Sequence, residues 1–296
     1  MKFQLPHEDE PVSTQPPVGS ATWAPGEGEG VIVPPQFDIE AVLHRTLDAI
    51  GQDPRWHPAR HYRVPVHEPE RDSRAGVHPS ELNECLRATA YSIVRAPRRR
   101  DLDRRSVQTF DHGSVIHIQW QSYLVEAEQL GLFENVQIEL EVHTENPPVF
   151  GHADATFWHD GYRYLVDIKS AGPSKFYGTK NLQGPMSVLS SVSVEHRRQV
   201  HAYMAGLGIY GAFMLYVDKA LDAFKALWVP FDQAFWEAEI AAPIRAAVQM
   251  VDKFALPRKT DKRYLCRGCP FQGICDRDMG LVEADRRQPS EALTTT

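Results

Sequence analysis

The dipeptide Asp160-Gly161 separates two runs of strand-forming residues, and it constrains the fold more than any other short feature of this chain. Asp-Gly in this setting predicts a β-hairpin with a two-residue type I′ turn, because both turn positions need a positive φ. If these two residues form the turn, facing residues have numbers that sum to 321, so Asp154 lies directly opposite Asp167. The sequence therefore predicts two carboxylates side by side on one face of an antiparallel strand pair.

The hairpin is expected to have one chemical face and one apolar face. Side chains alternate across a strand, so Lys169 and His152 are expected on the face of the two aspartates. Like charges at cross-strand distance repel, and a fold keeps them there when a cation lies between them. Oxygen ligands suit Mg²⁺ or Mn²⁺, although a surface ion pair between Asp167 and Lys169 is the alternative. The other face is expected to pack on the core through Ala153, Ala155, Phe157, Tyr164, Val166 and Ile168.

The composition is that of an ordinary soluble protein, with 296 residues, of which 42% are hydrophobic and 24% charged. No apolar run approaches the roughly 18 residues of a membrane helix, and the first residues lack a secretion signal, so a cytoplasmic location without a membrane partner is expected. The net charge of −7 argues against a protein coated in basic surface. Local basic clusters can still follow a phosphate backbone, although solvated helix faces explain them equally well. These clusters are Arg95, Arg98, Arg99, Arg100, Arg104 and Arg105; Arg197 and Arg198; and Arg258, Lys259, Lys262, Arg263 and Arg267.

The order of the expected elements predicts a mixed α/β domain over residues 37–280, between a disordered acidic tail at 1–36 and a frayed end at 281–296. A Gly-, Ser- and Pro-rich connection at 171–192 is long enough for a functional loop or lid. No GxxxxGK[ST] phosphate-binding loop is present, so ATP hydrolysis is not expected. Helices are expected at 38–50, from an N-cap at Ser80 to before Pro97, from 103 to Gly131, at 194–208 and at 232–255, with strands at 136–142, 211–217 and 224–230 besides the hairpin.

A histidine precedes the strands on one of these helices. Gly113, His117 and Gln121 recur every four residues, so they line one stripe of the helix. A neutral imidazole is a common ligand beside two carboxylates, although a lone helix histidine is more often a packed or capping residue. His117 is therefore a candidate third ligand.

A further pair follows the 171–192 connection. Gln199 and Tyr203 are four residues apart on a helix, next to Arg197 and Arg198. Glutamine and tyrosine can hydrogen-bond a phosphate or stack under a base, and arginine can pair with a phosphate. An ordinary amphipathic helix gives the same pattern, so the pair alone is a weak signal.

Taken in order, these motifs resemble those of the RecB-family branch of the PD-(D/E)XK nuclease superfamily. The family shows G-x-x-x-H on a helix, G-x-x-D and [DE]-x-K on strands, and Q-x-x-x-Y on a later helix. The matching residues, within about 80–280, are Gly113…His117, Gly151-His152-Ala153-Asp154, Asp167-Ile168-Lys169 and Gln199…Tyr203. The resemblance implies a restriction-endonuclease-like α/β core, with a central mixed sheet flanked by helices.

The resemblance also implies roles for individual residues. His117, Asp154 and Asp167 would bind the catalytic Mg²⁺ or Mn²⁺, with help from the Ile168 carbonyl. Lys169 would position or activate the attacking water. Gln199 and Tyr203 would engage DNA, with Arg197 and Arg198 beside them.

The four cysteines point to a second metal site. They are Cys85, Cys266, Cys269 and Cys275, the last three spaced C-x2-C-x5-C. In a cytosolic protein this spacing indicates a metal site rather than disulfides, and residue chemistry alone leaves zinc and an iron–sulfur cluster both open. One cysteine before the nuclease core and three after it are similar to the layout of the Cas-four-type iron–sulfur nucleases. That resemblance implies a [4Fe–4S] cluster that staples a helical, C-terminal subdomain to the core, with zinc as the second choice.

The function implied by the resemblance is a metal-dependent DNA exonuclease that prefers single-stranded or frayed ends. It would act in DNA recombination, repair or replication, with a helicase or recombinase as a partner in trans, in a stand-alone form that phages also carry. Two other function classes remain open: a non-catalytic DNA-end-binding adaptor with the same fold, and a structure-selective endonuclease. The intact set of Asp154, Asp167 and Lys169 favours the enzyme, and the iron–sulfur staple disfavours the endonuclease.

Overall fold

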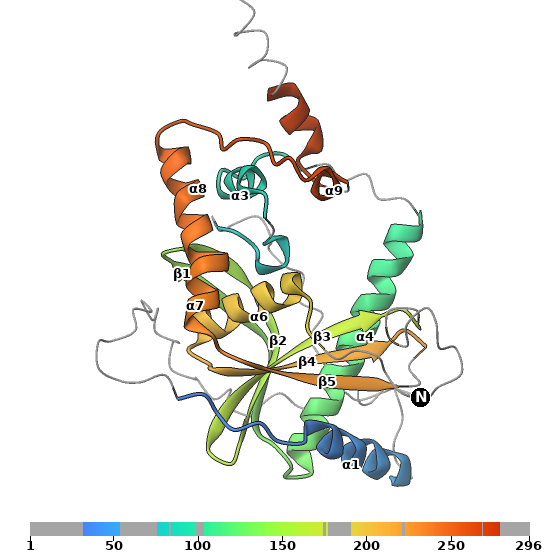
Figure 1. The fold of residues 1–296 in the computed structure, drawn as a ribbon. Helices are drawn as coiled ribbons and strands as arrows, with labels where there is room; N and C mark the ends of the chain where they lie inside the picture. Colours follow the sequence, from blue (N-terminus) through green and yellow to red (C-terminus); the bar gives the residue numbers. More distant parts are fainter. Residues whose placement is uncertain are drawn as a thin grey trace, which may run out of the picture.

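The computed structural model describes residues 32–53, 76–82, 84–98, 104–173, 176, 191–220, 223–267 and 269–278. A five-stranded sheet in the order β1-β2-β3-β4-β5 lies between helices (Figure 1). Neighbouring strands are antiparallel except β3 and β4, which are parallel and are joined through the helix α6 (Val194–Leu207). The strands are β1 (Glu134–Glu145), β2 (Pro148–His159), β3 (Tyr162–Ala171), β4 (Gly211–Asp218) and β5 (Phe224–Pro230). The predicted α/β class with a central mixed sheet is therefore confirmed.

The hairpin between β2 and β3 has the predicted turn and register. Asp160 and Gly161 have φ angles of 49° and 78°, as a type I′ turn requires. Strand partners run from His159↔Tyr162 to Ala155↔Val166 and sum to 321. The pairing ends there, so the predicted direct opposition of Asp154 and Asp167 is wrong in detail. The strands separate at the aspartates, and the Ile168 amide donates a hydrogen bond of 2.6 Å to Asp154 Oδ2.

The hairpin of β1 and β2 bends at the same level of the sheet. The register between these strands omits Glu139 and Asp154, and Glu139 has a positive φ of 51°. Ala153 packs in the core on one side of the sheet, and Ala155 packs in the core on the other. The prediction that these two alanines share an apolar face is wrong, because the strand changes faces between them.

Two apolar cores lie on opposite faces of the sheet. The helices α1 (Ile39–Gln52) and α4 (Arg104–Gln129) cover one face, and α6 covers the other. The core under α1 and α4 includes Leu43, Ile116, Trp120, Leu124, Phe157 and Val166. The core under α6 includes Tyr203, Met204, Leu165, Met214, Tyr216 and Trp236. Every strand is thus fixed from both faces, which holds the separated ends of β2 and β3 in place.

The remaining helices form the upper part of Figure 1 and its left side. α7 (Gln233–Trp236), the π-turn η2 (Glu237–Ala241) and α8 (Ala242–Asp252) follow one another over the predicted helix at 232–255. α3 (Leu86–Ile93) packs against α8, and the short helix α9 (Arg263–Cys266) lies near α3. No helix among the described residues is long and apolar enough to cross a bilayer.

Three boundaries differ from the sequence prediction. The helix expected to start at Ser80 is broken into the turn η1 (Pro79–Glu81) and α3, and His78 rather than Ser80 accepts the capping amide. Residues 32–36, predicted as part of the tail, contact the sheet at one place: Pro34 is buried, and the Tyr164 hydroxyl donates to the Pro35 carbonyl at 2.8 Å. The predicted loop at 171–192 and the end at 281–296 lie largely or wholly outside the described residues.

Candidate active site and cysteine site

Three elements bring four polar side chains together beside the point where β2 and β3 separate. α4 contributes His117, β2 contributes Asp154, and β3 contributes Asp167 and Lys169. His117 Nδ1 lies 3.4 Å from Asp154 Oδ1, and Lys169 Nζ lies 2.6 Å from Asp167 Oδ2. The structure thus brings together residues from three of the matched motifs, although His117 and Lys169 are 52 positions apart in the sequence.

Asp167 is the most unusual member of this group. Its side chain is fully buried, and neither carboxylate oxygen has a well-aligned hydrogen-bond donor among the described residues. Oδ2 faces the Lys169 ammonium as an ion pair, whereas Oδ1 has no such partner in the same set of residues. Burial raises the pKa of Asp167 to about 6, although the charge of Lys169 opposes this shift. A buried carboxylate oxygen left without a donor costs free energy, so this position suits a bound cation.

The pKa values of the other three groups are each shifted towards the charged form. Burial alone would raise the pKa of Asp154, but His117, Lys169 and the Ile168 amide outweigh it and hold that pKa below its usual value. Burial would lower the pKa of His117, but the Asp154 carboxylate more than compensates and raises it. Burial likewise acts against Lys169, and the two aspartates raise its pKa. The cluster therefore stabilises charge by mutual pairing.

The donor types of this cluster fit a hard divalent cation. Two carboxylates, an imidazole and the neighbouring Ile168 carbonyl are the kinds of ligand that Mg²⁺ and Mn²⁺ accept. Within the described ranges, no three His, Cys, Asp or Glu side chains are already arranged as the ligands of one ion.

Two further residues support the site. The Gln121 side chain, 1% exposed, donates from Nε2 to Glu139 Oε1 at 2.6 Å and to the Asp154 carbonyl at 3.0 Å. It thereby ties α4 to β1 and β2 where their pairing is interrupted. The sequence predicted that Gln121 lies on the same face of the helix as His117, but it predicted no role for Gln121. Glu139 was missed, because a glutamate in a half-exposed strand carries no signal.

The four residues of α6 predicted to contact DNA are mostly buried. Tyr203 is 2% exposed and accepts a 3.2 Å hydrogen bond from Gln199 Nε2. Arg198 is 5% exposed and lies 2.6 Å from Glu239. Arg197 is the one of the four that is half-exposed, and it is paired with Asp232 and stacked over the Phe235 ring. A buried ring cannot stack on a base, so the predicted stacking role of Tyr203 does not fit this structure.

Tyr203 instead packs inside the site. A Cβ atom on Gly151 would lie 3.2 Å from Tyr203 Cε1 and 2.9 Å from Pro79 Cδ, so the glycine of the G-x-x-D motif makes room for the ring. Burial, and then the charges of Asp167 and Asp154, raise the pKa of Tyr203 well above its usual value. The Q-x-x-x-Y motif is thus part of the wall behind the two aspartates.

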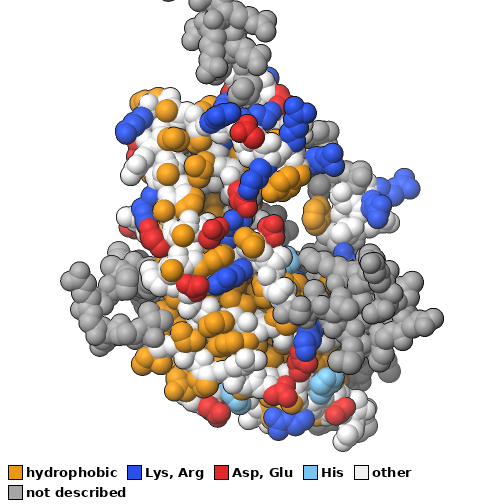
Figure 2. All heavy atoms as spheres, viewed as in Figure 1, with side chains coloured by type: hydrophobic (Ala, Val, Ile, Leu, Met, Phe, Trp, Pro, Cys, Tyr) orange, Lys and Arg blue, Asp and Glu red, His pale blue; other side chains and the backbone are white. Residues whose placement is uncertain are grey.

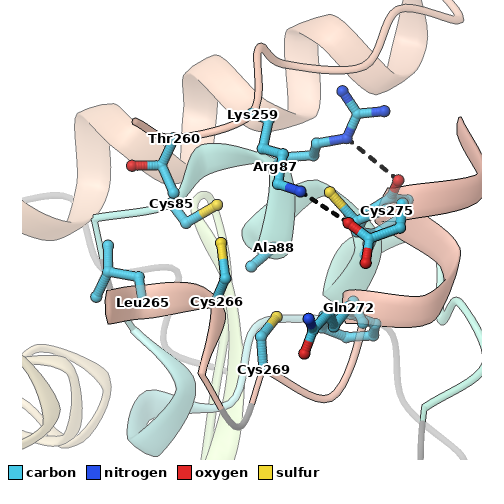
Figure 3. Close-up of a pocket in the computed structure, with 13 residues that line it drawn as sticks. Cys85, Arg87, Ala88, Lys259, Thr260, Leu265, Cys266, Cys269, Gln272 and Cys275 are labelled. Atoms are coloured by element: carbon cyan, nitrogen blue, oxygen red, sulfur yellow. Dashed lines mark hydrogen bonds and ion pairs between the residues drawn. The ribbon is translucent and has the colours of Figure 1, made fainter. Parts of the chain in front are cut away.

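All four cysteines line one pocket in the upper part of the molecule (Figure 3). Cys85 is the N-cap residue of α3, Cys266 ends α9, and Cys269 and Cys275 follow in the next turns. Figure 3 shows their sulfur atoms directed into the same space, and none of the four forms a disulfide. Burial raises the pKa of Cys269 and of Cys275, which is typical of structural rather than nucleophilic thiols.

A buried arginine joins the two parts of the chain that supply these cysteines. Arg87, 4% exposed, donates to the Pro257 carbonyl at 3.1 Å and to the Tyr91 hydroxyl at 3.2 Å. Tyr91 in turn donates to Asp278 and packs on Phe271. These contacts bring α3 and the C-terminal segment together beside the cysteines.

Comparisons with known proteins give no family. No family model matches the chain, and no curated protein matches it. Among solved structures, SSO0001 is similar at a TM-score of 0.40 and 15% identity, over 81% of this chain and 96% of that one. The alkaline exonuclease LHK-Exo from Laribacter hongkongensis is similar at 0.39 and 14%, over 60% and 89%, and its complex with dAMP at 0.41 and 14%. These TM-scores are too low to establish a shared fold, so the function rests on the site itself.

Proposed function

We propose that this chain is a deoxyribonuclease that uses Mg²⁺ or Mn²⁺ to hydrolyse phosphodiester bonds, acting as an exonuclease on single-stranded or frayed ends. One observation carries the proposal: a lysine, a histidine and two aspartates converge where two strands separate, and a fully buried Asp167 oxygen has no donor among the described residues. Burying a carboxylate oxygen without a donor lowers the stability of the fold. The same arrangement is useful in metal-dependent phosphoryl chemistry.

The residues divide the chemistry between them. Asp154, Asp167, His117 and the Ile168 carbonyl would hold the metal, which supplies charge neutralisation and a bound water of lowered pKa. Lys169 Nζ lies 2.6 Å from Asp167, so it can donate to a water or phosphate oxygen bound there. Gln121 fixes the Asp154 backbone through its carbonyl, and Tyr203 closes the wall behind the carboxylates.

For the cysteines we propose a [4Fe–4S] cluster, with zinc as the alternative. The support is that four thiols from both ends of the fold line one pocket and supply the four ligands that either centre needs. One cysteine before the core and three after it resemble the layout of the iron–sulfur nucleases, and that resemblance is why the cluster is preferred to zinc.

The nuclease proposal is tested with anaerobically purified full-length protein and end-labelled single- and double-stranded DNA. Cleavage should require Mg²⁺ or Mn²⁺ and stop with EDTA. Asp154→Ala and Lys169→Ala should each lower the rate at least about 100-fold. The matched controls are Asp160→Asn on the hairpin turn and Lys225→Ala on the edge strand, both of which should cut normally. An active Asp154→Ala variant, or cleavage in EDTA, would refute the assignment. DNA binding without any cleavage by the parent protein would favour the adaptor.

The cysteine proposal has its own readout. Protein purified without oxygen should be brown, absorb broadly near 400 nm, and lose the colour in air. Cys85→Ala should abolish the absorbance as fully as Cys269→Ala, whereas Thr260→Ala, which changes a non-ligand lining the same pocket, should keep it. Colourless protein with one zinc per chain would replace the cluster by zinc and leave the nuclease proposal intact.

A further inference from the structure

The upper part of the molecule in Figures 1 and 2 has a charge opposite to that of the whole chain. Residues 84–98 and 256–278 contain nine Lys or Arg and four Asp or Glu, whereas the full chain has a net charge of −7. Figure 2 shows blue side chains over this region. A polyanion would therefore be attracted here rather than to the sheet.

Three exposed side chains of α9 and its end stand out within this region. Arg263, Tyr264 and Arg267 lie within five residues, and Tyr264 is 62% exposed. Neither arginine has an ion-pair partner in the part of the chain that the structure describes. By contrast, Lys259 pairs with Asp276 and Lys262 pairs with Glu84. α9 thus presents two uncompensated guanidinium groups beside an open aromatic ring.

This surface adjoins the cysteine pocket. An open pocket of about 660 Å³ is lined by Lys259, Thr260, Asp261, Arg263 and Cys266. Lys259, Thr260 and Cys266 also line the pocket of the four cysteines. The open pocket beside Arg263 and the proposed metal centre therefore adjoin through these three residues.

A chain of ion pairs connects this surface with α6. Glu84 pairs with Lys262 next to α9, and it lies 3.6 Å from Arg198 on α6. α6 carries Tyr203, whose ring closes the wall behind the two aspartates. The Glu84 carboxylate thus links Lys262, beside the basic surface, to Arg198 on α6, which is also the helix that carries Tyr203.

We propose that Arg263, Tyr264 and Arg267 form a binding surface for single-stranded DNA. A base stacks on the exposed Tyr264 ring, and the two arginines hold the flanking phosphates. Unpaired bases suit such a ring because a duplex keeps its bases stacked internally. The inference rests on the proposed nuclease function, and it supplies the strand contact that the buried Tyr203 cannot make.

The test measures binding of fluorescent oligo(dT) by anisotropy, with the full-length protein carrying Asp154→Ala so that the strand stays intact. Adding Tyr264→Ala should raise the Kd about 5- to 150-fold, and Tyr264→Phe should stay within about threefold. Arg263→Ala with Arg267→Ala should reduce the slope of log K against log salt by about 1.4, at about 0.7 per contact. Tyr162→Ala and Arg45→Ala, an exposed tyrosine and arginine elsewhere, are the matched controls and should bind as the parent.

The outcomes separate this surface from the nuclease proposal. Equal binding by the Tyr264→Ala variant and the parent overturns the surface, even if the enzyme with Asp154 restored cleaves DNA. An equal loss in the Tyr162→Ala control also overturns it, because the effect is then not specific to α9. The 400 nm absorbance and the melting temperature should match across the series, and Tyr264→Phe identifies any variant whose loss comes from misfolding. If the parent neither binds nor cuts any DNA, the proposed function fails as well.

Discussion

The two glycines of the matched motifs have very different surroundings. Gly151 faces Pro79 and Tyr203 so closely that a Cβ would lie 2.9 and 3.2 Å from them, whereas a Cβ on Gly113 would meet Ser170 at an ordinary 3.7 Å. Gly151→Ala should therefore destabilise the protein by about 1–3 kcal/mol. Gly113→Ala lies inside α4 and should stabilise it by up to about 1 kcal/mol. Urea unfolding of both variants measures this, and equal effects would contradict the packing account.

A buried histidine makes stability depend on pH. His201 is fully buried, with Nδ1 2.8 Å from the Arg197 carbonyl and Nε2 accepting the Asp232 amide at 3.2 Å. Burial lowers the pKa of His201 to about 4, despite the opposing hydrogen bond to Arg197. The unfolded chain, with its usual pKa near 6.5, binds the proton more readily, so this contribution is complete above pH 6.5 and is lost as pH falls toward 4.

The size of that dependence is testable. Between pH 6.5 and 4 the folded protein should lose about 3 kcal/mol through His201, at about 1.4 kcal/mol per pKa unit. The slope of unfolding free energy against pH should therefore be steeper for the parent than for His201→Gln, whose side chain does not titrate. Parallel pH profiles would show that His201 is protonated in the fold at no cost.

At the scale of elements, the Gln121 side chain stabilises the place where the pairing of β1 and β2 is interrupted. Gln121→Ala removes the donor to Glu139 and to the Asp154 carbonyl, and should cost about 1–3 kcal/mol of stability. Because Asp154 then loses its backbone support, kcat should fall and the Mn²⁺ concentration for half-maximal activity should rise, with KM for DNA unchanged. Gln119→Ala, which only removes a contact to Tyr123 on the same helix, is the control. A loss of stability without a change in Mn²⁺ dependence would reduce Gln121 to a structural role.

The elements that could be predicted are those set by local sequence. The Asp160-Gly161 turn, its register and the ends of α4 and α6 follow from turn chemistry and periodicity. The bend at Glu139 could not be predicted, because it comes from contacts with Gln121 in another element. The burial of Tyr203 was missed for the same reason: a tyrosine four residues after a glutamine gives one pattern whether it faces solvent or core.

For the whole molecule, a metal bound only by the folded state should raise its stability. Mn²⁺ at about 100 times its Kd adds about 2.7 kcal/mol. The melting temperature of the parent should rise by several degrees, and that of Asp160→Asn should rise equally. Asp154→Ala should show no shift. A shift retained in Asp154→Ala would place the stabilising ion elsewhere, and differential scanning fluorimetry distinguishes the two results.

At this scale the sequence motifs predicted which residues belong to the candidate site, but they predicted the spatial arrangement of those residues less well. The order of the motifs placed His117, Asp154, Asp167 and Lys169 in one group, and the fold gathers them. The basic residues of α9 were noticed only as a cluster, since exposure depends on which surfaces the rest of the chain covers. Arg198 belonged to a similar cluster and is buried against Glu239.

The layout of the cysteine pocket also sets an order of events during synthesis. Cys85 and Cys266 line the same pocket, but 180 residues separate them in the chain. At about 5–20 residues per second, the ribosome makes Cys85 roughly 10–40 s before its first partner exists. The last strand, β5, ends at Pro230, so the sheet has been made by then while Cys85 still lacks the other three cysteines. The proposed metal centre would therefore form after the sheet, and the oxygen tension that the nascent chain meets would bear on how much protein carries it.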